Sequence, residues 1–211
     1  MSELVALPMF PLSGVHFPGQ DVPLHVFEPR YRALVDDVLA GNQEFGTALI
    51  SGGCEVGGGD RRTGVGTLLK VQLAAPFEDG RWLLVTRGIE RIRIVSWLDD
   101  DPYPRALVDL SPSAPADDVG DLLGRAAAAV RRLRMVLSEF EEGPCCSIDL
   151  NLGDDPTEAS WVLCALAPLT MLDQQQLLEE SDPTRRLDHL IELCRLRIAD
   201  LEAMHHLGGS T

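Results

Sequence analysis

The chain has 211 residues, of which 45% are hydrophobic, and a formal net charge of −15 from 33 acidic and 18 basic residues. This length and content suffice to build a core in one large domain or two small ones. The negative charge would repel a phosphate backbone, so the sequence predicts no binding to nucleic acid. No apolar run approaches the roughly 20 residues of a membrane helix, and the N-terminus lacks a signal-peptide pattern, which together predict a cytoplasmic protein with no membrane partner.

The five cysteines are odd in number and irregularly spaced, which favours reduced thiols over a disulfide framework. They are Cys54, Cys145, Cys146, Cys164 and Cys194. Adjacent cysteines such as Cys145 and Cys146 rarely form a bridge without strain, and no histidine or second cysteine stands at zinc spacing. We therefore expect the cysteines to be small buried apolar residues, although the role of the Cys145-Cys146 pair stays open.

Residues 7–35 combine short apolar stretches with prolines and end in the start of a helix. Prolines cannot donate to a sheet, so Pro8, Pro11, Pro18 and Pro23 predict strand starts, edges and turns. The stretch from Val22 to Phe27 predicts a strand with a buried face. Pro29 suits a first helical position, and Gly41 is expected to end that helix. Its apolar residues fall on one face at helical spacing: Tyr31, Leu34, Val35, Val38 and Leu39.

This region resembles, in order and spacing, the start of the N-terminal substrate-binding domain of Lon proteases, in the form found in small stand-alone bacterial proteins. The resemblance is carried by Phe10-Pro11-Leu12, Phe17-Pro18-Gly19, Pro23-Leu24-His25-Val26-Phe27 and Glu28-Pro29-Arg30-Tyr31-Arg32. It implies a PUA-like β pseudo-barrel followed by helices, a fold also similar to the N-terminal region of cereblon. It further implies contact with substrate polypeptides.

The next part of the chain predicts more strands, at 44–51, 66–75, 82–95 and 104–110. Asp79-Gly80 predicts a hairpin turn between the second and third of these, and Gly88 a bend or bulge. The glycine-rich stretch 52–62 predicts a surface loop, since it lacks the ending of a phosphate-binding loop. Arg87, Arg91 and Arg93 suggest either an anion or acidic-peptide site or a solvated face, of which we favour the face.

Residues 111–118 separate the strands from a helical region. Helices are expected at 119–140, after Asp155-Pro156, at 170–180 and after Asp182-Pro183. The segments around Ala167-Pro168-Leu169-Thr170 and Arg186-Leu187-Asp188-His189-Leu190 again resemble the Lon domain. The sequence therefore predicts an α+β fold, with a barrel subdomain at 1–112 and a helical subdomain of about four helices at 113–211, which together form one Lon N-terminal-type unit.

The chemistry of Lon's other parts is absent from this sequence. The ATPase of Lon requires a Walker loop and its protease a serine-lysine dyad, whereas the one lysine here, Lys70, falls in a predicted strand. His16 and His25 are expected to be structural, because no nucleophile motif accompanies them. His205 and His206 lack a spaced third ligand. We therefore predict no catalytic, cofactor-binding or metal-binding residue, no cofactor and no enzymatic activity.

A groove is expected between the two subdomains as the site of substrate recognition, and two functional hypotheses remain. A strand edge in such a groove can hold an extended peptide. The first hypothesis is a module that recognises unfolded or degron-bearing polypeptides and passes them to a separate protease. The second is a structural or regulatory protein with one dedicated protein partner, a homodimer being one form; a hidden hydrolase ranks third. Phe10, Phe17 and Phe27 are predicted to be core residues rather than contacts, so the binding residues are unknown.

Overall fold

The computed structural model describes residues 4–52, 61–110, 119–140, 152–153 and 155–208. The chain divides into two compact units, Met1–Ser113 and Ala114–Thr211, which we call unit 1 and unit 2. Strands make up most of unit 1 and helices make up unit 2, which confirms the α+β class. The predicted loop at 53–60, the predicted boundary at 111–118 and Cys54, Cys145 and Cys146 lie outside the described residues, as do the side chains of His205 and His206.

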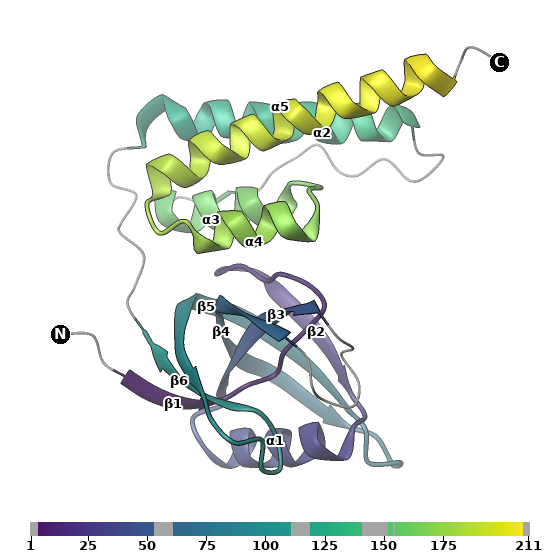
Figure 1. Ribbon diagram of the computed structural model, residues 1–211. Helices are drawn as coiled ribbons and strands as arrows, with labels where there is room; N and C mark the ends of the chain where they lie inside the picture. The colour runs from purple at the N-terminus through teal and green to yellow at the C-terminus, as the bar shows by residue number, and fades with distance from the viewer. Residues whose placement is uncertain (1–3, 53–60, 111–118, 141–151, 154, 209–211) are drawn as a thin grey trace. The chain divides into compact units, whose positions relative to one another are not determined.

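Unit 1 is built on one antiparallel sheet with helix α1 (Pro29–Ala40) packed against it (Figure 1). Its strand order is β1-β6-β5-β4-β3, and β2 also pairs with β5. The long strand β5 therefore has three partners along its length. The strands are β1 (Leu4–Pro8), β2 (Asp21–Val26), β3 (Glu44–Gly52), β4 (Arg61–Pro76), β5 (Trp82–Trp97) and β6 (Arg105–Asp109).

The two ends of this strand order, β1 and β3, are joined by the segment that follows β1. The amides of Phe10 and Leu12 donate to the carbonyls of Gly46 and Ala48 at 2.8 and 3.0 Å, and the Ile50 amide donates back to the Leu12 carbonyl at 2.9 Å. Residues 9–12 thus run parallel to β3. The sheet curls upon itself and encloses a core.

Gly88 produces the bend in β5 that the sequence predicts. The register passes from Leu68 opposite Glu90 to Leu69 opposite Gly88, so Ile89 is the extra residue of a bulge. A Cβ at Gly88 would lie only 2.2 Å from the Phe17 carbonyl oxygen. Only glycine therefore allows the loop before β2 to approach β5 this closely.

Helix α1 begins at Pro29 and ends before Gly41, as predicted. Four of its residues are buried, Tyr31, Leu34, Val35 and Val38, and they pack in a core with strand residues such as Leu24 and Phe45. The hydroxyl of Tyr103 reaches this helix and donates to the Asp37 carboxylate at 2.6 Å. Burial, together with this hydrogen bond, raises the pKa of Tyr103 to about 12.

Unit 2 contains helices α2 (Gly120–Phe140), α3 (Pro156–Leu166), α4 (Met171–Glu179) and α5 (Pro183–Gly208). Figure 1 shows α2 beside α5, and α3 beside α4 in a second layer. The predicted helix starts are confirmed: the carboxylates of Asp155 and Asp182 accept from the amides of Thr157 and Arg185 at 2.8 and 3.0 Å. Within the described residues, no helix is both long and apolar enough to cross a membrane.

A fully buried arginine, which the sequence did not predict, joins three elements of unit 2. The Arg186 guanidinium stacks on Trp161, with its central carbon 3.4 Å from the ring centroid. Its Nη1 donates to the Glu180 carbonyl at 3.0 Å, and its Nη2 donates to Ser160 Oγ at 2.8 Å. The stacking and the two hydrogen bonds compensate in part for burying the cation. They tie the start of α5 to α3 and to the end of α4.

We predict that Gly88→Ala destabilises the protein while Gly64→Ala leaves it nearly unchanged. The added methyl group at Gly88 would meet backbone atoms, whereas a Cβ at Gly64 has no atom within 4 Å. Overpacking of this kind costs about 1–3 kcal/mol. Urea unfolding of the two variants measures the difference. Equal free energies of unfolding would show that the loop can move away from β5.

We predict that Tyr103→Phe lowers stability at pH 7 by about 1 kcal/mol, the usual net value of one hydrogen bond. Because the pKa of Tyr103 is raised in the folded state, its contribution is complete below pH 10 and is lost as the pH rises to about 12. The gap between wild type and variant should therefore narrow over that window. Urea unfolding at pH 7, 10 and 11.5 tests this, and a constant gap would contradict it.

Candidate functional site

A small hollow of about 210 Å³ opens on unit 1 beside strand β2. Four pieces of chain form it: the segment that runs along β3, the strand β2, the link from β2 into α1 and the first turn of α1. Its lining residues are Phe10, Leu12, Pro23, Leu24, His25, Phe27, Glu28 and Tyr31. All of them fall within the stretch 7–35 that carries the family resemblance.

Strand β2 pairs with β5 along one edge only. The Gly88 amide donates to the Gln20 carbonyl at 2.8 Å, and antiparallel residues alternate between facing and avoiding their partner strand. The backbones of Asp21, Pro23 and His25 are therefore directed away from β5. Among the described residues, no hydrogen bond occupies these outward groups. The second edge of β2 is open.

Prolines occur on both chain segments that border the hollow. Pro23 has no N–H to offer on the open edge of β2. In the facing segment, Phe10 and Leu12 bond to β3, so the backbone of Pro11 between them is directed away from β3. Proline on an edge prevents a regular ladder from forming there. This explains why the two segments leave a seam rather than a hydrogen-bonded closure.

The base of the hollow is aromatic. The rings of Phe10 and Tyr31 lie 4.1 Å apart between centroids, at an angle of 56°. The Arg30 guanidinium carbon lies 4.5 Å from the Tyr31 ring centroid, and Arg30 pairs with Glu28 at 3.1 Å. The carboxylate at the rim is thus already partnered, which favours an apolar occupant for this hollow.

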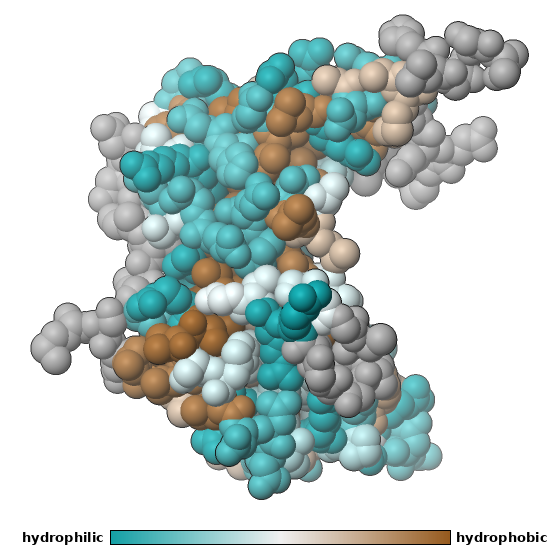
Figure 2. All heavy atoms as spheres, viewed as in Figure 1, coloured by the Kyte–Doolittle hydropathy of each residue, from teal (hydrophilic) through white to brown (hydrophobic). Residues whose placement is uncertain are grey.

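Phe27 is the residue on which the sequence-based prediction was wrong. Phe10 and Phe17 are core residues, as predicted, with 7% and 0% of their surface exposed. Phe27 is 55% exposed at the mouth of the hollow. Val22, Leu24 and Val26 face inward at every second position of β2, so Phe27 must face outward. Figure 2 shows further apolar patches on the visible face of unit 1.

The other residues considered from the sequence have structural roles or ion-pair partners. Lys70 pairs with Glu44 at 3.1 Å, and the carbonyl of His16 accepts from the Thr67 hydroxyl. Arg87 and Arg93 pair with Asp21 and Asp109 at 3.1 and 2.6 Å. These pairs favour a solvated face over an anion site. In the described part of the chain, no three histidine, cysteine, aspartate or glutamate side chains could jointly hold a metal ion.

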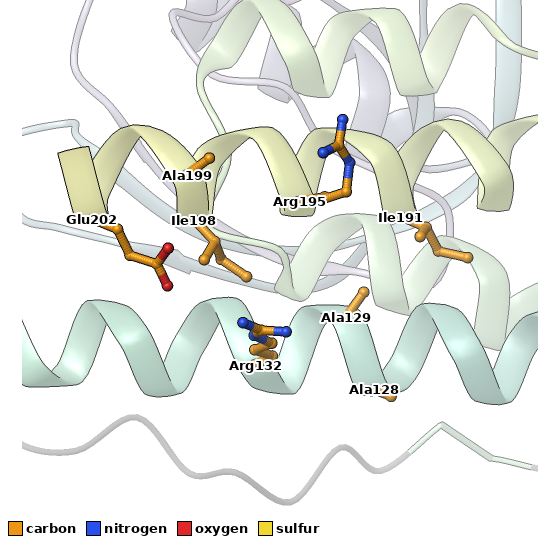
Figure 3. A pocket seen from close by; sticks show the side chains of 8 residues that line it. All are labelled: Ala128, Ala129, Arg132, Ile191, Arg195, Ile198, Ala199 and Glu202. Atoms are coloured by element: carbon orange, nitrogen blue, oxygen red, sulfur yellow. The ribbon is translucent and has the colours of Figure 1, made fainter.

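A second and larger opening, of about 440 Å³, lies between α2 and α5 of unit 2 (Figure 3). Its walls are mostly alanine and isoleucine, with charged side chains at the rim. The lining residues are Ala128, Ala129, Arg132, Ile191, Arg195, Ile198, Ala199 and Glu202. We call this opening the α2/α5 groove. The sequence did not reveal it, because α2 and α5 are joined only by packing.

A curled antiparallel sheet with one helix, followed in the chain by a helical unit, defines an α+β class of domain. The chain belongs to the family of the substrate-binding domain of the ATP-dependent protease La (Lon), whose model matches residues 6–195. This confirms the family inferred from the sequence.

Individual relatives agree with this assignment. Lon protease 2 of Herpetosiphon aurantiacus is 26% identical over 205 residues, which cover 95% of this chain but 25% of that protease. A Lon N-terminal domain protein from Xanthomonas campestris is 28% identical, with a TM-score of 0.65 over 89% of this chain and 98% of the other. The N-terminal domain of a Mycobacterium avium complex Lon protease, at 22% identity, shares the fold with a TM-score of 0.67 over 90% and 98% of the chains. This chain thus spans a quarter of the Herpetosiphon protease.

We predict that Cys164 and Cys194 resist alkylation in the native protein. Both side chains are buried, and burial raises the pKa of each thiol to about 12. At pH 7.5 both thiols stay neutral and out of reach of a reagent. Iodoacetamide labelling followed by peptide mass spectrometry, with and without urea, measures this. Equal labelling in both conditions would contradict the buried placement.

Proposed function

We propose that this protein is a non-catalytic module that binds extended, non-native polypeptide segments at the open edge of β2. The observation that carries the proposal is the pairing of an unoccupied strand edge with an aromatic hollow at the same place. Membership of a substrate-binding domain family supports the polypeptide as ligand. Delivery of the bound chain to a separate protease, in the cytoplasm, is part of this proposal.

Main-chain hydrogen bonds would supply affinity for any sequence. The carbonyls of Asp21, Pro23 and His25 face away from β5 and can accept from an added strand, and the N–H of His25 can donate to it. Strand addition of this kind leaves side chains free to select among segments. A folded protein has few unpaired strand segments to offer, so the edge would prefer non-native chains.

The hollow would supply selectivity for apolar side chains. Its aromatic base, with Phe10 beside Tyr31, favours a large apolar or aromatic side chain. The exposed ring of Phe27 at the mouth can close over such a side chain. A basic or neutral segment would be preferred over an acidic one, because the chain carries a net charge of −15.

The alternative is a structural or regulatory protein with one dedicated partner, which includes a homodimer. It would use the same open edge and hollow with a single folded ligand. The two functions differ in what they bind: a general module accepts many non-native chains, while a dedicated partner site accepts few of them. The experiment therefore compares binding of a non-native chain with binding of a folded one.

The test is a fluorescence-anisotropy titration of the protein with a labelled, permanently unfolded polypeptide and with the same polypeptide folded. We expect saturable binding that prefers the unfolded form. Phe27→Ala should weaken binding about tenfold, as expected when a central aromatic contact is removed, and His25→Pro should weaken it by removing the N–H on the open edge.

The matched control is Leu4→Ala, since Leu4 is 51% exposed on β1 and lies outside the hollow. It should bind like the wild type. Circular dichroism of all variants verifies that the sheet is retained. Binding that ignores both β2 changes, or no binding at high micromolar concentration, would reject this site and leave the dedicated partner as the better function.

A further inference from the structure

We propose that the α2/α5 groove is a docking site for an amphipathic helix of a partner protein, separate from the polypeptide site on unit 1. The occupant presents an apolar stripe to the alanines and isoleucines of the groove, an acidic residue to Arg132 and a basic residue, one turn further along, to Glu202. This assigns a second ligand class to the chain and does not rest on the function proposed for β2.

The walls of the groove favour a helix over an extended strand. Both walls are helices, whose backbone groups are satisfied internally, so they offer no edge for strand addition. Ala128, Ala129 and Ala199 leave space for another helix to approach closely, and Ile191 and Ile198 supply ridges against which it can pack. The groove therefore fits side-chain packing between helices.

The length of the groove sets the size of the occupant. Along α5 its lining runs from Ile191 to Glu202, a difference of eleven positions. At a rise of 1.5 Å per residue this is about 16 Å, or three turns of a helix. Ile191 and Ile198 are seven residues apart, so apolar residues at i, i+3 or i+4, and i+7 of the partner would match them.

The charges in the groove define the polarity of the occupant. Figure 3 shows Arg132 directed from α2 towards α5 and Glu202 directed from α5 towards α2. Both side chains belong to exposed residues, and neither makes an ion pair among the described residues. The third charged group, Arg195, is directed away from α2 and is held by Glu192 through contacts of 2.6 and 2.9 Å.

One cation and one anion thus remain available, and they lie at different points along the groove. Glu202 follows Ile198, which faces Arg132 in Figure 3, by four residues, about one helical turn. A partner helix that matches both charges must carry its acidic and basic residues about one turn apart. If the partner helix bound in the reverse direction, its basic residue would lie opposite Arg132 and its acidic residue opposite Glu202. The repulsion between like charges disfavours that direction.

The test uses the full chain and a labelled designed helix of about 14 residues, long enough for three turns with capped ends. The peptide carries leucines at i, i+4 and i+7, a glutamate to face Arg132 and a lysine to face Glu202. A second peptide has the two charges exchanged. We expect saturable binding of the first peptide and weaker binding of the second.

Arg132→Glu should lower affinity for the first peptide about fivefold, the size of a partly exposed charge pair, and should raise affinity for a peptide with lysine at the facing position. The matched control is Arg131→Glu, a neighbouring change of charge outside the groove. Ala129→Trp should abolish binding by filling the groove, and the exposed Arg132 variant keeps the test valid if the tryptophan impairs folding. Phe27→Ala should leave this binding unchanged.

Several results would overturn the proposal. Failure of both peptides to bind at millimolar concentration would exclude a helix as the occupant. Binding that is unchanged in Arg132→Glu and Ala129→Trp would place the peptide elsewhere. If the peptides fail to bind and Arg132→Glu instead alters self-association in sedimentation, the groove accepts a second copy of this chain.

Discussion

The parallel run of residues 9–12 along β3 is the constraint on which the rest of unit 1 depends. β1 pairs with β6 at one end of the strand order, and the chain must then cross to β3 at the other end. The backbone hydrogen bonds donated by the amides of Phe10, Leu12 and Ile50 fix that crossing. Strand β2 pairs with β5, and the hollow beside it is also lined by Phe10 and Leu12 of the segment that is bonded to β3.

The prolines turn this geometry into an open site. A barrel built from regular strands would close at the seam, because unpaired edges attract partners. Pro11 and Pro23 remove donors on both sides, so the protein keeps an edge that is polar in its carbonyls yet poor in N–H groups. Such an edge does not form a regular β-ladder with the neighbouring segment of its own chain. Its carbonyls can still accept hydrogen bonds from an added strand. The cost of leaving it open is limited, since the exposed carbonyls can bond to water.

Local patterns predicted most of the fold, and the failures have physical causes. Pro29 and Gly41 mark α1, and Asp155 and Asp182 mark helix starts, because caps depend on adjacent residues. Phe27 was misplaced because its apolar character was weighed above the strict alternation of β2. The α2/α5 groove and the stacking of Arg186 on Trp161 could not be predicted, since both unite residues that are distant in sequence and meet only through packing. For the same reason, the sequence showed the residues of the hollow as a motif but did not show that they line a common hollow.

The two sites differ in what they can recognise, and the difference follows from their walls. A strand edge reads a backbone and is nearly indifferent to sequence, whereas a groove between helices reads side chains in a fixed order. At the hollow, the lining carboxylate of Glu28 is paired with Arg30, and Asp21 of β2 is paired with Arg87. The groove, by contrast, retains Arg132 and Glu202. Indifference to sequence suits a ligand that is any non-native chain, and fixed charges suit a partner that must be one particular helix. If both proposals hold, one chain would bind a non-native polypeptide on unit 1 and a partner helix on unit 2.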